Sequence, residues 1–144
     1  MSAYKLYRLS RYFYEKNIVV ISKILVKLNK VINNCYIPYT AEIGVGTEFA
    51  YGGIGVVIHD KSIIGENCII GQGITIGGRG IHGGPPIIGN NVFIGAGSRL
   101  IGDFKIGDFA QIGVNSVVIK EVPEYSVVAG IPARIIKRLD KYEN

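Results

Sequence analysis

Cysteine and long apolar runs are both scarce in this sequence of 144 residues. Its two cysteines, Cys35 and Cys68, lie in unlike contexts without CxxC spacing, which argues against a disulfide framework or a zinc ribbon and favours the reducing cytoplasm. The most apolar run, from Ile18 to Ile32, is interrupted by five polar residues. The sequence therefore predicts no membrane-spanning helix, and its N-terminus lacks the pattern of a signal peptide.

Acidic residues are nearly absent from the first part of the chain. Residues 1–34 hold seven Lys or Arg against the single Glu15, so this segment carries +6, whereas the remainder of a chain of net charge +5 carries −1. The basic character therefore belongs to this segment alone. No nucleic-acid partner is expected.

The same segment has helical periodicity. Between Tyr4 and Ile32 apolar residues recur at steps of three and four, and Asn17 is the expected break and N-cap between two short helices. The apolar side is expected to pack on the next domain as a helical cap, with the basic side in water. The alternative is that the basic helices contact an anionic membrane surface.

After residue 34 the sequence becomes a repeat rich in glycine. The dipeptide Ile-Gly occurs ten times, beginning at Ile43, Ile54, Ile64, Ile70, Ile76, Ile88, Ile94, Ile101, Ile106 and Ile112. Aliphatic residues recur at steps of six from Ile58 to Ile76 and again from Ile88 to Val118. A period of six fits neither a helix nor a flat strand, and it predicts an all-β solenoid in which one aliphatic side chain per repeat points inward.

Two segments interrupt this repeat. Nine positions separate Phe49 from Ile58 where six are expected, and "GGRGIHGGPP" at residues 77–86 is predicted to form a loop. The two histidines of the chain, His59 and His82, lie at these interruptions. Irregular segments of an otherwise monotonous solenoid are the expected place for a site.

Three stretches resemble the hexapeptide-repeat acyltransferases, and among them the serine acetyltransferase branch. These are "IIGENCIIGQGITIGGRG", "FIGAGSRLIGDFKIGDFAQIGVNSVVIKEVP" and "VVAGIPARIIKRL". The resemblance implies a left-handed parallel β-helix over residues 35–139, after a helical segment at 1–34 and before a tail at 140–144. It also implies a homotrimer with its active sites in grooves between neighbouring solenoids.

The resemblance implies acetyl transfer from acetyl-CoA to a hydroxyl, with a histidine as general base and no metal. The Asp-His pair of serine acetyltransferases falls here on residues 50–52, where the chain has Ala-Tyr-Gly, so that base is missing. The candidate bases are His59, with Asp60 as its orienting partner, and His82, which would reach a neighbouring chain. Tyr51 is a candidate for positioning the acceptor.

Coenzyme A contacts follow from the same resemblance. The turn Gly77-Gly78 and the small residue Ala96 would let the pantetheine arm lie against backbone amides. Cations for the phosphates are expected from Lys120, Arg134 and Lys137.

The acceptor is first predicted to be a sugar hydroxyl in surface polysaccharide synthesis, because "GGIGVVIHD" resembles strands of polysaccharide-cluster relatives. The alternative is serine. Against serine stand the missing Asp-His pair, a short helical segment and the tail "DKYEN", which lacks a terminal isoleucine. Further alternatives are a metal-dependent protein like the γ-carbonic anhydrases, which need three histidines, and a scaffold without activity.

Overall fold

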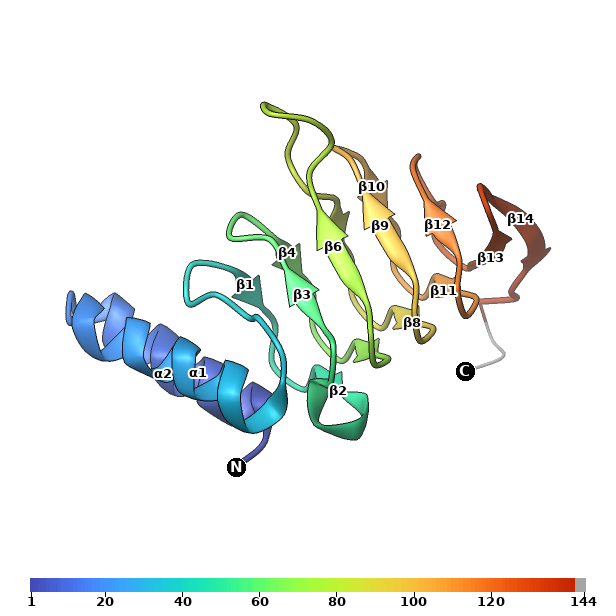
Figure 1. Cartoon of the computed structure of the whole chain (residues 1–144). Coiled ribbons are helices and arrows are strands. Elements are labelled where there is room, and N and C mark those ends of the chain that lie inside the picture. The colour runs from blue at the N-terminus through green and yellow to red at the C-terminus, as the bar shows by residue number, and fades with distance from the viewer. Residues whose placement is uncertain (142–144) are drawn as a thin grey trace.

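The computed structural model describes residues 1–141, which form a helical hairpin followed by a triangular solenoid (Figure 1). The hairpin consists of α1 (Ala3–Glu15) and α2 (Val19–Asn33), and a 3₁₀ helix, η1, covers Ala50–Gly53. The strands are β1 (Glu42–Ile43), β2 (Glu48–Phe49), β3 (Val57–Ile58), β4 (Ile63–Ile64), β5 (Ile69–Ile70), β6 (Thr75–Gly77), β7 (Ile87–Ile88), β8 (Phe93–Ile94), β9 (Arg99–Ile101), β10 (Lys105–Ile106), β11 (Gln111–Ile112), β12 (Val117–Val118), β13 (Ser126–Gly130) and β14 (Ala133–Arg138).

The described strands form three sheets, one on each side of the solenoid. The β1 face has the order β1-β4-β7-β10, the β3 face has β12-β9-β6-β3, and the β2 face has β14-β13-β11-β8-β5-β2. Neighbouring strands are parallel except for β13 and β14, which pair antiparallel at the C-terminal end. The chain thus passes from the β1 face to the β2 face to the β3 face in each coil.

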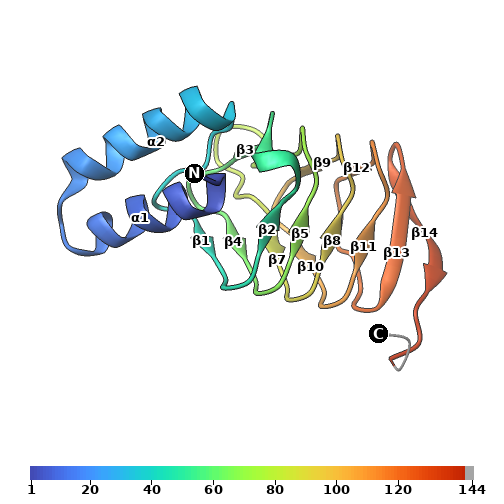
Figure 2. The same cartoon turned by 90° about the horizontal axis from the view of Figure 1, so that it is seen from below.

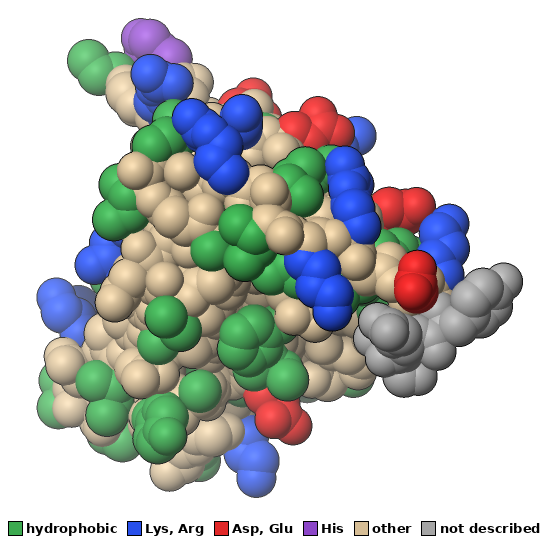
Figure 3. Space-filling view, turned by 90° about the vertical axis from the view of Figure 1, so that its right-hand side faces the viewer, with side chains coloured by type: hydrophobic (Ala, Val, Ile, Leu, Met, Phe, Trp, Pro, Cys, Tyr) green, Lys and Arg blue, Asp and Glu red, His purple; other side chains and the backbone are tan. Residues whose placement is uncertain are grey.

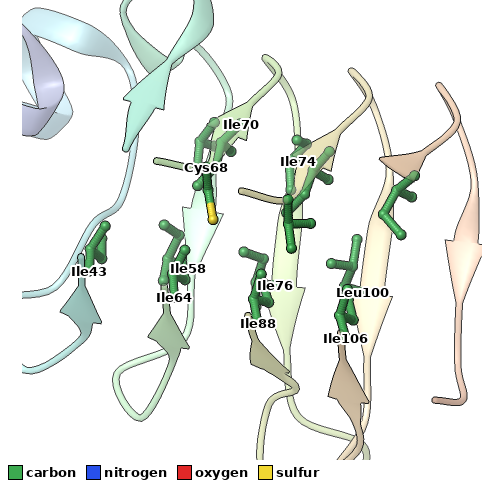
Figure 4. Close-up of a cluster of buried hydrophobic side chains, with 14 of the residues drawn as sticks. Ile43, Ile58, Ile64, Cys68, Ile70, Ile74, Ile76, Ile88, Leu100 and Ile106 are labelled. Carbon is green, nitrogen blue, oxygen red and sulfur yellow. The ribbon is translucent and has the colours of Figure 1, made fainter. Parts of the chain in front are cut away.

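The core of the solenoid is a set of stacked columns of aliphatic side chains (Figure 4). On the β3 face Ile58, Ile76 and Leu100 lie one above another, and each is at most 1% exposed. In each two-residue strand the second side chain points inward and the first points outward, as the pleat requires. The six-residue period therefore predicts the inward side chain of every strand in the parallel coils.

The residues that pair between neighbouring strands give the length of each coil. Ile87 pairs with Lys105, so the coil between them consists of three hexapeptides. Glu48 pairs with Ile69, and this coil is longer by half a hexapeptide because it contains η1. Thr75 pairs with Arg99, and this coil is longer by a whole hexapeptide because it contains the loop at 78–86. Both interruptions predicted from the sequence are therefore insertions that leave the pairing register of the strands unchanged.

The break between the two helices lies where the sequence predicts it, but the capping residues differ from those predicted. Lys16 is the C-cap of α1, and Asn17 has φ 61°, the left-handed conformation that ends a helix. Ile18 is the N-cap of α2, and no side chain caps that helix end. The expectation that Asn17 is an N-cap is wrong, because its backbone conformation places it at the end of α1.

The orientation of α2 also differs from the expectation. Its buried side chains are Ser22 and Asn29, which face α1. Ser22 Oγ donates to the carbonyl oxygen of Ser10 (2.9 Å), and Asn29 Nδ2 donates to that of Ala3 (3.0 Å). Six apolar residues of α2 are exposed, whereas Val19, Leu25 and Val26 are half-buried. The helix packs along α1 at the N-terminal end of the solenoid (Figure 2).

Candidate functional site

His59 follows β3 directly, in the turn that leads to β4. Its backbone N–H donates to the carbonyl oxygen of Ile76 (2.9 Å), and its own carbonyl accepts from the N–H of Ser62 (3.0 Å). These two bonds fix the backbone of the turn. The turn belongs to the edge of the solenoid between the β3 and β1 faces, here called the histidine edge, which comprises residues 59–62, 78–86, 102–104 and 119–121.

The imidazole of His59 contacts an acid. Nδ1 lies 2.8 Å from Asp60 Oδ1, and it is also 3.1 Å from the backbone nitrogen of Lys61, whose N–H points at it. The two contacts favour different tautomers: with a proton on Nδ1 the ring donates to Asp60, and without one it accepts from Lys61. In the first tautomer Nε2 keeps its lone pair and can accept a proton from a substrate.

A hollow of about 340 Å³ lies against this imidazole. It is lined by Tyr36, Val57, His59, Asp60, Thr75 and Gly77, with Ile58 and Ile76 beneath. The structure thus brings three predicted residues together: His59, Asp60 and Gly77. Tyr36 and Thr75 were not predicted. Counting one regular coil forward from Val57 finds Thr75, whereas Tyr36 is placed beside Val57 only by its bridge to that residue.

His82 lies on the same edge but outside this hollow, in the exposed part (79–82) of the loop at 78–86. The loop turns sharply back, since a Cβ on Gly78 would collide with the carbonyl oxygen of Gly83. Its tip carries Ile81, which is 95% exposed. Figure 3 shows a histidine at the end of a projection from the solenoid. The loop therefore holds His82 away from the solenoid of its own chain.

Tyr51 and Ala96 lie on a different edge, between the β2 and β3 faces, here called the tyrosine edge and comprising residues 50–56, 71–74, 95–98 and 113–116. Tyr51 is 78% exposed and has φ 51°, so η1 turns its ring outward from the core. The carbonyl oxygen of Ala96 accepts from the N–H of Asn115 (2.8 Å). Neither residue lines the hollow beside His59.

The predicted phosphate-binding cations divide into two groups. Lys120 and Arg134 line a hollow of about 250 Å³ at the C-terminal end, together with Val118, Glu121, Val122, Val128, Ala133 and Ile135. Lys137 does not line this hollow and lies farther along β14, paired with Val127. Figure 3 shows basic side chains spread over this end of the molecule.

The cysteines are not candidate nucleophiles. Burial raises the pKa of the Cys35 thiol from 9.0 to about 11, and burial likewise raises the pKa of Cys68. Both side chains are at most 3% exposed, so they remain protonated and out of reach near neutral pH. Among residues 1–141, no group of three or more His, Cys, Asp or Glu could hold a metal ion, and no helix is long and apolar enough to cross a membrane.

Comparison with known proteins identifies similar molecules. Residues 85–120 match the family described as bacterial transferase hexapeptide (six repeats). The chain is 38% identical over 134 residues to the serine acetyltransferase of Synechococcus elongatus, and this covers 92% of the chain and 54% of the relative. It is 41% identical over 138 residues to that of Staphylococcus epidermidis, covering 94% of the chain and 61% of the relative.

Solved structures agree. The crystal structure of serine acetyltransferase from Brucella abortus strain S19 in complex with coenzyme A superimposes with a TM-score of 0.91 at 31% identity, over 96% of this chain and 56% of that one. The predicted fold class, a left-handed parallel β-helix with two N-terminal helices, is confirmed, and so is the resemblance to serine acetyltransferase-like hexapeptide acyltransferases. This chain spans little more than half the length of these relatives.

The prediction of a polysaccharide acceptor is wrong. The similar proteins are serine acetyltransferases, at 36–41% identity for the Synechococcus, Haemophilus and Staphylococcus epidermidis relatives. Residues 50–52, the tail and the short helical segment differ from the pattern of serine acetyltransferases. By contrast, the similarity covers at least 92% of the chain in these relatives. A few substituted positions weigh less than a likeness that covers nearly the whole chain.

Proposed function

Because this chain is a hexapeptide-repeat protein similar along nearly its whole length to serine acetyltransferases, we propose that it is an acetyl-CoA-dependent acyltransferase that acetylates the hydroxyl of serine. The observation that carries the proposal is the contact between His59 Nδ1 and Asp60 Oδ1 at 2.8 Å, beside a hollow on the solenoid surface. It gives this chain a histidine paired with an acid although residues 50–52 lack the pair that the family resemblance implies.

The chemistry assigned to His59 is general base catalysis. Asp60 accepts the Nδ1 proton, which leaves the Nε2 lone pair for the serine hydroxyl. As Nε2 takes the hydroxyl proton, the serine oxygen bonds to the thioester carbonyl carbon. The carbon–sulfur bond then breaks, and the proton passes from Nε2 to the leaving thiolate. Acetyl-CoA supplies the activated acetyl group, and the products are O-acetylserine and coenzyme A.

Other residues of the hollow suit a small polar acceptor. Tyr36 and Thr75 carry hydroxyl groups on the outward side of the β3 face, in the column that runs through Val57. A hydroxyl can donate to a carboxylate or accept from an ammonium group, and serine presents both. We assign Tyr36 and Thr75 to acceptor binding in place of Tyr51, which lies on the tyrosine edge.

The hollow at the C-terminal end suits the nucleotide part of coenzyme A. Lys120 and Arg134 supply positive charge for phosphates, and Val118, Val128 and Ala133 supply an apolar floor. From β3 to β12 is three strand spacings, roughly 14 Å, along one face. The pantetheine arm would follow this face past Gly77 to reach His59.

We further propose that the active molecule is a homotrimer. In the two middle strands of the β1 face, β4 and β7, the outward side chains Ile63 and Ile87 are apolar and 41% exposed. In β5 and β8 of the β2 face, the outward Ile69 and Phe93 are 46% and 43% exposed. Such columns are typical of surfaces that pack between subunits. In a trimer, the loop that bears His82 would extend toward a neighbouring solenoid.

The experiment that tests the proposed function measures release of the free thiol of coenzyme A with serine, threonine and simple sugars as acceptors. The proposal predicts thiol release that requires serine and yields O-acetylserine. Thiol release with a sugar and none with serine would contradict the proposed acceptor.

A further inference from the structure

The helical hairpin presents a surface that acetyl transfer does not use. Four residues of α2 recur at steps of four and three and lie on its outer side: Val20, Ile24, Leu28 and Val31, which are 70%, 57%, 41% and 81% exposed. Lys23, Lys27 and Lys30 are exposed along one flank of this row. These seven residues are called the α2 outer face.

The apolar side of a helix in a globular protein usually packs inward. In α2 this aliphatic row faces outward instead. The fully buried side chains of α2 are polar: Ser22 and Asn29 donate hydrogen bonds to carbonyl oxygens of α1, with the half-buried Leu25 and Val26 on either side of them. These bonds fix the rotation of the helix, so its apolar side remains in water. A row of exposed aliphatic side chains of this size marks an interaction surface.

The charges around the face indicate what it binds. Residues 16–34 contain no acidic residue, and Glu15, the only acid of the hairpin, pairs with Arg11 Nε at 2.9 Å. Two α2 outer faces brought together would juxtapose lysines without any carboxylate to neutralise them. A partner that complements this face must therefore be apolar at its centre and anionic around it.

We propose that the α2 outer face binds the surface of a membrane that carries anionic phospholipid headgroups. The aliphatic row enters the boundary between headgroups and acyl chains, and the lysines extend along it to reach the phosphates. The hairpin lies at the N-terminal end of the solenoid, where α2 packs mainly on α1 (Figure 2). The protein can therefore bind a membrane through α2 with its solenoid in water.

The test is co-sedimentation of the full chain with vesicles of phosphatidylcholine alone or mixed with phosphatidylglycerol. We expect binding to the anionic vesicles and weakening by salt, since the attraction is partly electrostatic. Lys23→Gln with Lys27→Gln should lower the affinity about thirtyfold, whereas the matched control, Lys105→Gln with Lys141→Gln, should leave it unchanged.

A second pair of variants tests the aliphatic row. Val20→Gln with Val31→Gln should lower vesicle affinity about tenfold or more, and the control, Val45→Gln with Ile136→Gln at similar exposure, should not. All these side chains are on the surface, and circular dichroism would verify that each variant is folded. Acetyl transfer to serine should be unchanged in the α2 variants, so this proposal and the proposed function fail separately.

Three results would overturn the membrane proposal. The first is equal sedimentation with and without phosphatidylglycerol, or none with either. The second is that the chain self-associates without vesicles and that Val20→Gln with Val31→Gln abolishes this self-association, which would assign the face to a second copy of the chain. The third is binding to an RNA or DNA duplex that depends on Lys23 and Lys27 but not on Val20 and Val31.

Discussion

The hydroxyl of Tyr7 joins the helical hairpin to the first coil of the solenoid: it donates to the carbonyl oxygen of Ala41 at 2.7 Å and accepts from the N–H of Ile43 at 3.1 Å. Tyr7 is 2% exposed, and its ring belongs to the same core as Ile43 and Ile64. Burial raises the pKa of this phenol, so it remains protonated and able to donate at physiological pH.

Replacing Tyr7 by phenylalanine should therefore destabilise the contact between the helical hairpin and the first coil. The variant leaves the carbonyl oxygen of Ala41 and the N–H of Ile43 without their shared partner, and we expect a loss of about 1–3 kcal/mol in the free energy of unfolding. Urea denaturation measures it. Tyr12→Phe is the matched control, since Tyr12 is 53% exposed, and it should change stability by less than about 0.5 kcal/mol. Equal effects of the two variants would show that the Tyr7 hydroxyl is not important for stability.

The close approach of successive coils is testable at Gly95. A Cβ there would lie 2.6 Å from the backbone nitrogen of Val114 and 2.7 Å from the carbonyl oxygen of Ile112. Because both atoms belong to backbone, Gly95→Ala should cost about 1–3 kcal/mol. Gly84→Ala is the control, since its Cβ would meet nothing nearer than Asp103 Cγ at 3.9 Å. Thermal unfolding should show a lower melting temperature for Gly95→Ala than for Gly84→Ala. An unchanged melting temperature for Gly95→Ala would contradict the close approach of the coils.

The buried thiols predict how stability changes at high pH. The pKa of Cys35 rises from 9.0 to about 11 because burial disfavours the thiolate, so the folded protein retains a proton that the unfolded chain loses. This contribution to the free energy of unfolding is present below pH 9 and disappears as pH rises toward 11. Denaturation at a series of pH values should show the decline, and Cys35→Ala should make it shallower. A decline of the same size in Cys35→Ala would assign it to other groups.

Much of the fold could be predicted because its physics is local and repeated. A six-residue period defines which side chain points inward, and insertions of half a hexapeptide and of a whole one preserve it. The rotation of α2 could not be predicted from periodicity, because the sequence offers an aliphatic row and a polar row on the same helix. The choice depends on hydrogen bonds from Ser22 and Asn29 to carbonyl groups on another helix.

The candidate site was predicted in part. His59, Asp60 and Gly77 meet in one hollow because they follow or end strands that are stacked in adjacent coils. Tyr36 was missed because it precedes the regular repeat, and only its bridge to Val57 reveals that it extends the same column. His82, the second predicted base, lies outside this hollow, on the loop at 78–86.

Asp60 should act through the tautomer of His59. Without its carboxylate, Nδ1 is free to accept from the N–H of Lys61, which places the proton on Nε2 and removes the base. Since Asp60 is an exposed partner, we expect Asp60→Ala to lower kcat about fivefold with little change in KM for serine. Asp60→Asn, which can still accept from Nδ1, should recover part of the loss. A change confined to KM would instead indicate that Asp60 binds serine.

The most direct test of the account is the rate of coenzyme A thiol release with serine for wild type, His59→Ala and His82→Ala. Removing a general base should lower kcat about a hundredfold or more in His59→Ala. The His82→Ala variant should lose less, because His82 lies outside the hollow that His59 and Asp60 line. Wild-type turnover of serine by His59→Ala, measured on folded protein, would contradict the assignment of His59 as the base.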